Sequence, residues 1–283
     1  MACSQEMQGP VEIFKMSGHG NDFIIVDNSR ETLKANWRDC AIRWCRRRVS
    51  VGADGLLIIG PSRDADLSLR IFNADGSEAE MCGNGVRCAA RFAVEREITG
   101  STLAISTLAG IIRARVEGRK ACIRLPDLAE MMDPLSVETE VGRYLAYPVH
   151  LGVPHAVIFF DSVADLPAKT VHDLGRSVRF HRLFEPAGTN VDLLQVVAPN
   201  HIRVRTYERG VEGETMACGT GAVASAIAAH LFGDAGDLPI AVEMPGGVLD
   251  VSFMKDGFCF SNIWLSGDVD WVFHGEILKD GEY

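Results

Sequence analysis

The sequence contains one cysteine-centred phrase twice. Met81-Cys82-Gly83-Asn84-Gly85 and Ala217-Cys218-Gly219-Thr220-Gly221 each run directly into an apolar, alanine-rich segment, and the two cysteines stand 136 positions apart in a chain of 283 residues. Other segments recur at nearly the same offset, namely 20–26 with 152–158, 52–57 with 188–193 and 109–111 with 246–248. This offset is far longer than the repeat of a solenoid. We therefore expect two similar domains, related by a pseudo-twofold axis, that place Cys82 and Cys218 across one cleft.

The hydrophobic pattern predicts the same structural recipe in both halves. Short strand-like runs bounded by glycine, proline and asparagine are expected at 13–15, 23–27, 55–59, 67–72, 104–107, 111–117, 147–151, 155–160, 192–198, 201–207, 240–244 and 248–253. Helices are expected at 37–47, at 171–177 and after each of the two cysteines. A helix that is apolar on all sides must be enclosed. We predict an α/β fold (α+β in some schemes) of two pseudo-symmetric domains, each a curved mixed sheet or barrel around one buried helix.

The expected domain boundary lies in an acidic, proline-containing crossover at 127–139. One half covers residues 1–127, with the C-terminal segment 272–283 returning to it, and the other half covers residues 128–271.

Composition narrows the class of protein. With 28 basic and 38 acidic residues the formal charge is −10, which argues against a nucleic-acid partner. No apolar run approaches the ~20 residues of a membrane span, and the first ten residues resemble a disordered leader rather than a signal peptide, so a cytoplasmic protein is expected. Eight cysteines without a C-x-x-C pair fit neither a disulfide framework nor a metal module. We expect reduced thiols and no metal site.

A thiol at the start of a helix is biased toward thiolate, because free backbone N–H groups and the helix dipole stabilise the anion. The glycines beside Cys82 and Cys218 let the backbone approach a ligand, and two helix starts directed at one point would bind a carboxylate. Two opposed thiols suit racemisation or epimerisation, in which one removes a proton from carbon and the other delivers one to the opposite face. No cofactor is then required. The two sulfurs should be roughly 7 Å apart in the closed enzyme.

At these residues the chain resembles the diaminopimelate epimerase family, which comprises cofactor-independent isomerases of lysine biosynthesis that interconvert LL- and meso-diaminopimelate. The resembling segments run nearly end to end: 15–23, 71–78, the Cys82 phrase, 152–155, Asn190, 207–210, 213–215, the Cys218 phrase and 245–247. The resemblance implies that Cys82 and Cys218 are the acid and base pair. It also implies a homodimer that acts on a small molecule.

The family pattern assigns further roles by position. Asn21, Asn73, Asn190, Glu208 and Arg209 would hold the substrate, Gly83, Asn84, Gly219 and Thr220 would bind its reacting end, and His155 and Glu208 would tune the pKa values of the two thiols. The chemistry of diaminopimelate agrees, because its distal end carries an ammonium that suits a glutamate and a carboxylate that suits the fork of an arginine.

Several alternatives stay open from the residues alone. Asn73 could simply form a hairpin turn, Asn190 an Asx turn, and His155 a structural histidine, while His19 is expected to be only a loop residue. Val153 and Gly55 replace an asparagine and a glutamine found in relatives, which leaves a histidine or other amino acid racemase on the same scaffold as a rival function. A non-catalytic amino acid-binding protein or a thiol redox protein is the alternative of a different class.

Overall fold

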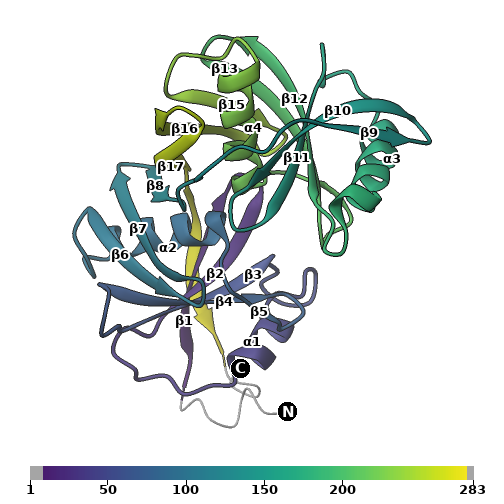
Figure 1. Ribbon diagram of the computed structural model, residues 1–283. Helices are drawn as coiled ribbons and strands as arrows, with labels where there is room; N and C mark the ends of the chain where they lie inside the picture. Colours follow the sequence, from purple (N-terminus) through teal and green to yellow (C-terminus); the bar gives the residue numbers. More distant parts are fainter. Residues whose placement is uncertain (1–8, 279–283) are drawn as a thin grey trace. The chain divides into compact units, whose positions relative to one another are not determined.

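The computed structural model describes residues 9–278, so most of the expected leader and the last five residues lie outside the described residues. The chain divides into two compact units (Figure 1). Unit 1 contains the chain up to Ile123 together with the segment that begins at Gly267, and unit 2 runs from Arg124 to Ser266.

Unit 1 is built on strands that pair in the order β18-β1-β2-β3-β4-β6-β7-β8, with the short β5 also on β4. The pairs β2–β3 and β4–β6 are parallel and the others antiparallel. Its elements are β1 Val11–Gly18, β2 Asn21–Asp27, α1 Trp37–Trp44, β3 Gly55–Gly60, β4 Leu67–Asn73, β5 Glu78–Ala79, α2 Gly83–Glu95, β6 Thr102–Thr107, β7 Gly110–Glu117, β8 Lys120–Arg124 and β18 Asp270–Ile277.

Unit 2 repeats this scheme strand for strand. Its order is β9-β10-β11-β12-β13-β15-β16-β17, with β14 also on β13, and its parallel pairs, β11–β12 and β13–β15, stand at the equivalent places. Its elements are β9 Leu135–Thr139, β10 Gly142–His150, β11 Pro154–Phe159, α3 Ala168–Arg179, the 3-10 helix η1 Arg182–Phe184, β12 Asn190–Ala198, β13 His201–Glu208, β14 Gly213–Thr215, α4 Gly219–Phe232, β15 Ile240–Met244, β16 Gly247–Asp256 and β17 Cys259–Asp268. The predicted fold of two pseudo-symmetric α/β units is therefore confirmed.

Each unit has one helix enclosed by its strands, α2 in unit 1 and α4 in unit 2 (Figure 1). Every residue from Ala222 to Ala229 is completely buried. Alanine predominates in this stretch because small side chains let strands approach a helix from several directions. A helix apolar on all sides is stable only when enclosed in this way, as the sequence predicts.

Each unit also has a helix that is not enclosed, α1 in unit 1 and α3 in unit 2, which packs in a hydrophobic cluster of its own. Trp37 and Trp44 of α1 pack with Ile24 and Val26 of β2 in one buried cluster. In unit 2, the apolar face of α3 packs in the same manner against β11 and β12. These strands carry buried side chains on both faces, which explains why 23–26 is a continuous apolar run rather than an alternating one.

The structure also departs from the predictions. The expected crossover at 127–139 contains strand β9, and strands β5, β8, β14, β17 and β18 were not predicted. Cys40 is disulfide-bonded, which corrects the expectation of reduced thiols at that position. Neither Cys82 nor Cys218 is in a disulfide.

Candidate active site

Cys82 and Cys218 occupy the same position in the two units, the residue immediately before the enclosed helix. Both have extended backbones, with φ −142° and ψ 113° at Cys82 and φ −123° and ψ 111° at Cys218, and neither helix has a side-chain cap. The first N–H groups of a helix have no partner within it, so an uncapped N-terminus can bind an anion. The predicted placement of both thiols at helix starts is confirmed.

Around Cys82, two of the predicted substrate-binding residues contact each other. Asn84, 4% exposed in the first turn of α2, donates from Nδ2 to Oδ1 of Asn21 at 2.6 Å. Asn21 in turn donates to Asp54 at 3.1 Å, and Arg47 pairs with the other oxygen of Asp54 at 2.8 Å. These hydrogen bonds fix the orientation of the side-chain amides of Asn21 and Asn84 at the start of α2, the helix that follows Cys82.

Asn73, the third asparagine predicted in this unit, forms a turn at the end of β4. Its Nδ2 donates to the hydroxyl of Ser77 at 2.9 Å, and its carbonyl accepts from the N–H of Gly76, whose φ is +84°. Asn73 therefore forms a turn, and its predicted contact with substrate stays a prediction. The next residue, Ala74, donates its N–H to the carbonyl of Asp54 at 3.2 Å, which ties this turn to the Asn21 cluster.

Sequence reasoning missed Arg87. Its side chain is completely buried, and its Nη2 donates to Oδ1 of Asn84 at 2.7 Å and lies 3.2 Å from Nδ1 of His19. His19 is therefore more than a loop residue. The available signal was the position of Arg87, three residues after Asn84 and therefore on the same face of the helix.

In unit 2, a chain of side-chain contacts leads from a buried carboxylate to the thiol. Nδ1 of His155 lies 2.7 Å from Oδ2 of Asp192, and both side chains are fully buried. The other ring nitrogen of His155 lies 2.9 Å from the hydroxyl of Thr220, which is 3.6 Å from the sulfur of Cys218. His155 and Thr220, both predicted from the family pattern, thus lie together beside Cys218.

Asp192 was also missed, although Asn190 two residues earlier was predicted. Residues two apart on a strand face the same side, and both side chains contact His155. The second oxygen of Asp192 accepts from the hydroxyl of Thr206 at 2.7 Å. Both carboxylate oxygens of Asp192 therefore accept hydrogen bonds from side chains buried in the core.

The predicted distal contacts gather around Asn190. Its Oδ1 accepts from the backbone N–H of Arg209 at 2.8 Å, and its Nδ2 donates to the carbonyl of Pro154 at 3.1 Å. Arg209 follows Glu208, the last residue of β13. Burial raises the pKa of the Glu208 carboxyl above its usual range.

The electrostatics of Cys218 differ from the expectation for a helix N-terminus. Burial raises the pKa of this thiol well above its usual range, and the nearby carboxylates of Glu208 and Asp192 raise it further. Hydrogen bonds from Thr220 and from the backbone of Gly221 act in the opposite direction but do not prevail. The predicted bias toward thiolate is wrong for Cys218 in this structure.

The two departures from the family pattern have different structural settings. At Gly55, an added Cβ would lie 2.8 Å from the carbonyl oxygen of Phe72, so this backbone as it stands accepts only glycine. Val153 is half-buried just before β11, and its carbonyl accepts from the N–H of Leu151 at 3.1 Å.

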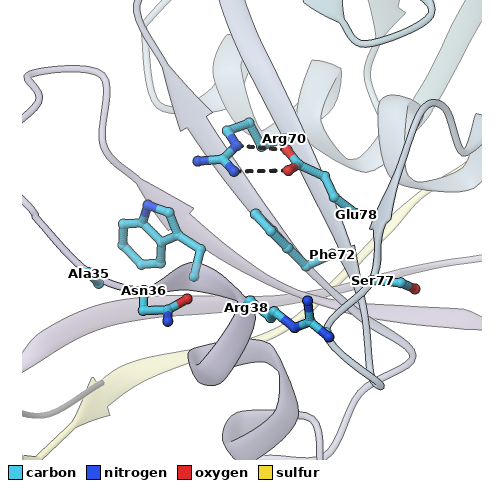
Figure 2. Close-up of a pocket in the computed structure, with 9 residues that line it drawn as sticks. Ala35, Asn36, Arg38, Arg70, Phe72, Ser77 and Glu78 are labelled. Carbon is cyan, nitrogen blue, oxygen red and sulfur yellow. Dashed lines mark hydrogen bonds and ion pairs between the residues drawn. The ribbon is translucent and has the colours of Figure 1, made fainter. Parts of the chain in front are cut away.

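A cavity of about 300 Å³ opens elsewhere in unit 1 (Figure 2). A bidentate ion pair between Arg70 and Glu78, with N–O distances of 2.7 and 2.9 Å, forms part of its wall. Its lining comprises Ala35, Asn36, Trp37, Arg38, Arg70, Phe72, Gly76, Ser77 and Glu78. None of the predicted site residues lines it.

Residues 9–278 lack both a membrane-spanning helix and a metal-binding cluster. No helix there combines the length and apolar character needed to cross a membrane. No group of three or more histidine, cysteine, aspartate or glutamate side chains there is arranged to hold a metal ion.

Comparison of the chain with known proteins gives consistent results at the level of sequence. The diaminopimelate epimerase family model matches residues 13–134 and 147–270. Among curated relatives, diaminopimelate epimerase of Aquifex aeolicus (strain VF5) is 41% identical over 95% of this chain and 99% of its own length. That of Methanocella arvoryzae is 37% identical over 95% and 98%.

Solved structures share the fold at low sequence identity. A phenazine biosynthesis protein of the PhzF family from Bacillus anthracis is 17% identical, with a TM-score of 0.70 over 95% of this chain and 99% of that one. A probable proline racemase from Agrobacterium radiobacter K84 is 16% identical, with a TM-score of 0.69 over 96% and 94%. The match of the family model to both halves and the identity of the curated relatives over nearly their full length show that this chain belongs to the diaminopimelate epimerase family.

Proposed function

We propose that this protein epimerises LL-2,6-diaminopimelate to meso-diaminopimelate in lysine biosynthesis, using Cys82 and Cys218 as a thiolate and thiol pair without a cofactor. The observation that carries the proposal is the duplication of one chemical position. Two units with the same strand order each have a cysteine thiol, not in a disulfide, at the start of an enclosed helix that lacks a side-chain cap. The family membership and the relatives named above support the substrate.

The proposed reaction consists of two proton transfers at one carbon. The thiolate removes the α-proton from one face, and the thiol on the opposite face gives its proton to the resulting carbanion. The negative charge that develops on the substrate carboxylate would be stabilised by the N–H groups at the starts of α2 and α4, beginning with Gly83 and Gly219. The proposal requires the two sulfurs to approach to roughly 7 Å when substrate is bound.

The distal end of the substrate would be held from unit 2. Arg209, whose backbone is fixed by Asn190, would bind the distal carboxylate, and Glu208 would bind the distal ammonium. Amides at Asn21 and Asn84 would orient the reacting end beside Cys82. We further propose that the protein acts as a cytoplasmic homodimer on this small-molecule substrate.

The test is solvent hydrogen exchange in deuterated water, with the stereochemistry of the product determined and without added pyridoxal phosphate or metal. Deuterium should enter the α-position of LL-diaminopimelate as meso-diaminopimelate forms, while histidine and proline should not exchange. Exchange of histidine alone would replace the proposed substrate with the rival amino acid racemase function.

Single substitutions test the two-thiol mechanism. Cys82→Ala and Cys218→Ala should each abolish epimerisation while substrate binding, measured by calorimetry, survives. Cys259→Ala is the matched control, because that cysteine is exposed and donates only to the carbonyl of Ala129. Retained turnover in both active-site variants would refute the mechanism, and unaltered binding without any turnover in the wild type would favour a binding protein.

A further inference from the structure

Arg87 is an unusual residue for the interior of a protein. Its side chain is completely buried in α2, yet among the described residues no aspartate or glutamate pairs with it, and its Nε and Nη1 have no hydrogen-bond partner. Only Nη2 is used, toward Asn84 and His19. A buried charge is costly unless it is paired and fully hydrogen-bonded. The expected compensation for Arg87 is therefore a negative charge that belongs to the working site.

The groups that face the Arg87 guanidinium limit what this charge can be. Its hydrogen-bonding neighbours are the Asn84 amide and the His19 ring. Three thiols interact with it electrostatically, namely Cys88 on the same helix, Cys82 at the N-cap of that helix and Cys122 on β8. Cys88 is completely buried, and burial raises the pKa of its thiol to about 12, so it stays neutral. Cys82 is half-buried and stands at the helix start, where backbone N–H groups also favour an anion.

The environment of Cys218 has the opposite sign. Its neighbours are the carboxylates of Asp192 and Glu208, and the described residues around it include His155 but no arginine or lysine that pairs with either carboxylate. A thiolate at Cys218 would be repelled by these carboxylates. The two thiols have the same backbone position, so the difference comes from the side chains packed behind each helix.

We infer that Arg87 is a positioning residue that orients Asn84 and supplies the buried positive charge that makes Cys82 the resting thiolate and Cys218 the resting thiol. The inference rests on the proposed function of this cysteine pair. Cys82 then takes the α-proton of the incoming substrate as its S–H bond forms, and Cys218 gives up its S–H proton to the opposite face of the carbon. After one turnover the charges are exchanged, and a proton must pass from Cys82 back to Cys218 through solvent before the same direction can be repeated.

The test measures thiolate formation at each cysteine without any turnover. The wild-type protein is alkylated with iodoacetamide across a pH series, and the modified peptides are quantified by mass spectrometry. The rate at Cys82 should rise at a pH at least one unit below that at which the rate at Cys218 rises. In Arg87→Met the Cys82 midpoint should move up by about one unit or more, which near neutral pH is about a tenfold slower reaction.

Two further variants separate charge from packing. Arg87→Lys keeps the positive charge and should retain most of the low midpoint of Cys82. Arg91→Met is the matched control, because it removes a second buried arginine from the same helix, one that already pairs with Glu95. It should leave the Cys82 midpoint unchanged.

Several results would overturn the inference. The inference is wrong if Cys218 of the wild-type protein ionises at a lower pH than Cys82, and this result does not depend on whether any variant folds. A folded Arg87→Met protein with an unshifted Cys82 midpoint would overturn the inference as well, since that result would leave Arg87 with a packing role only. Because alkylation needs no substrate, loss of the proposed epimerase function would leave the order of the two midpoints intact, and a reversed order in an active epimerase would refute this inference alone.

Discussion

The substitution Asp192→Ala tests the claim that the core of unit 2 depends on a buried carboxylate. Asp192 is fully buried, and its two oxygens accept from His155 at one side and from Thr206 at the other, both at 2.7 Å. Alanine would remove both acceptors and leave a cavity. His155 would then lose the partner of its Nδ1 and keep Thr220 and Asn190 as neighbours of its Nε2.

The magnitude follows from the two orphaned groups. Each buried donor left without its acceptor costs about 1–3 kcal/mol, and bonds to a carboxylate are at the strong end of that range, so losing both acceptor oxygens should cost about 3–5 kcal/mol. Asp192→Asn should cost less, about 1–3 kcal/mol, since an amide can accept from His155 with its oxygen while its nitrogen donates to the hydroxyl of Thr206, so that mainly the charge assistance is lost. Thr206→Val, which deletes a single donor, is the smallest change in the series.

The assay is urea unfolding of the three variants and the wild type at neutral pH, followed by circular dichroism. We expect the free energy of unfolding to decrease in the order wild type, Thr206→Val, Asp192→Asn, Asp192→Ala. A folded Asp192→Ala protein that loses less than about 1 kcal/mol would refute the reasoning, because it would mean that His155 and Thr206 are satisfied without the carboxylate.

Three other predictions concern stability. Burial raises the pKa of Asp22, but hydrogen bonds from Arg47 and Lys15 outweigh it and lower this pKa from 3.8 to about 2. Because Asp22 is partly exposed, we expect its charge to stabilise the fold by only about 1 kcal/mol, an effect present above pH ~4 and lost as the pH falls through ~2. The difference in unfolding free energy between wild type and Asp22→Asn should therefore vanish at the acid end of a titration. Gly55→Ala should lower the midpoint of thermal unfolding, since its Cβ would lie 2.8 Å from a backbone carbonyl oxygen, and an unchanged midpoint would show that the strand can shift. Gly175→Ala would bring a Cβ within 2.4 Å of Tyr207, which is 1% exposed, so overpacking of about 1–3 kcal/mol should outweigh the gain in helix propensity, as urea unfolding can measure.

The sequence was most informative where the duplication repeats local chemistry. The phrases around Cys82 and Cys218 predict both enclosed helices and their starting residues. The glycine that follows each cysteine and the alanine-rich run after it lie next to each other in the sequence, so no distant contact is needed to recognise them. Strand β18 was not predicted because most of its residues are exposed or half-buried, so it lacks the alternation that identifies a strand. Its place beside β1 is set by pairing across nearly the whole length of the chain.

The missed site residues share a physical cause. Arg87 and Asp192 are charged residues in mostly apolar segments. Their side-chain partners lie far away in the sequence, 68 residues for Arg87 and His19 and 37 for Asp192 and His155. Periodicity shows which face a residue occupies but not which side chain it meets there. Only the fold brings a buried charge to its partner.

The two units show how a duplicated scaffold can support a reaction that needs unequal partners. A thiolate and a thiol cannot have identical surroundings, because the same surroundings would give both cysteines the same affinity for a proton. Strand order, helix position and backbone geometry at Cys82 and Cys218 are shared. The charged side chains that act on them differ: in unit 1 it is Arg87, which no carboxylate of the described residues pairs with, and in unit 2 they are the carboxylates of Asp192 and Glu208. Duplication therefore accounts for the matched backbone position of the two cysteines, and the divergence of a few charged side chains would supply the unequal protonation that the proposed pair needs.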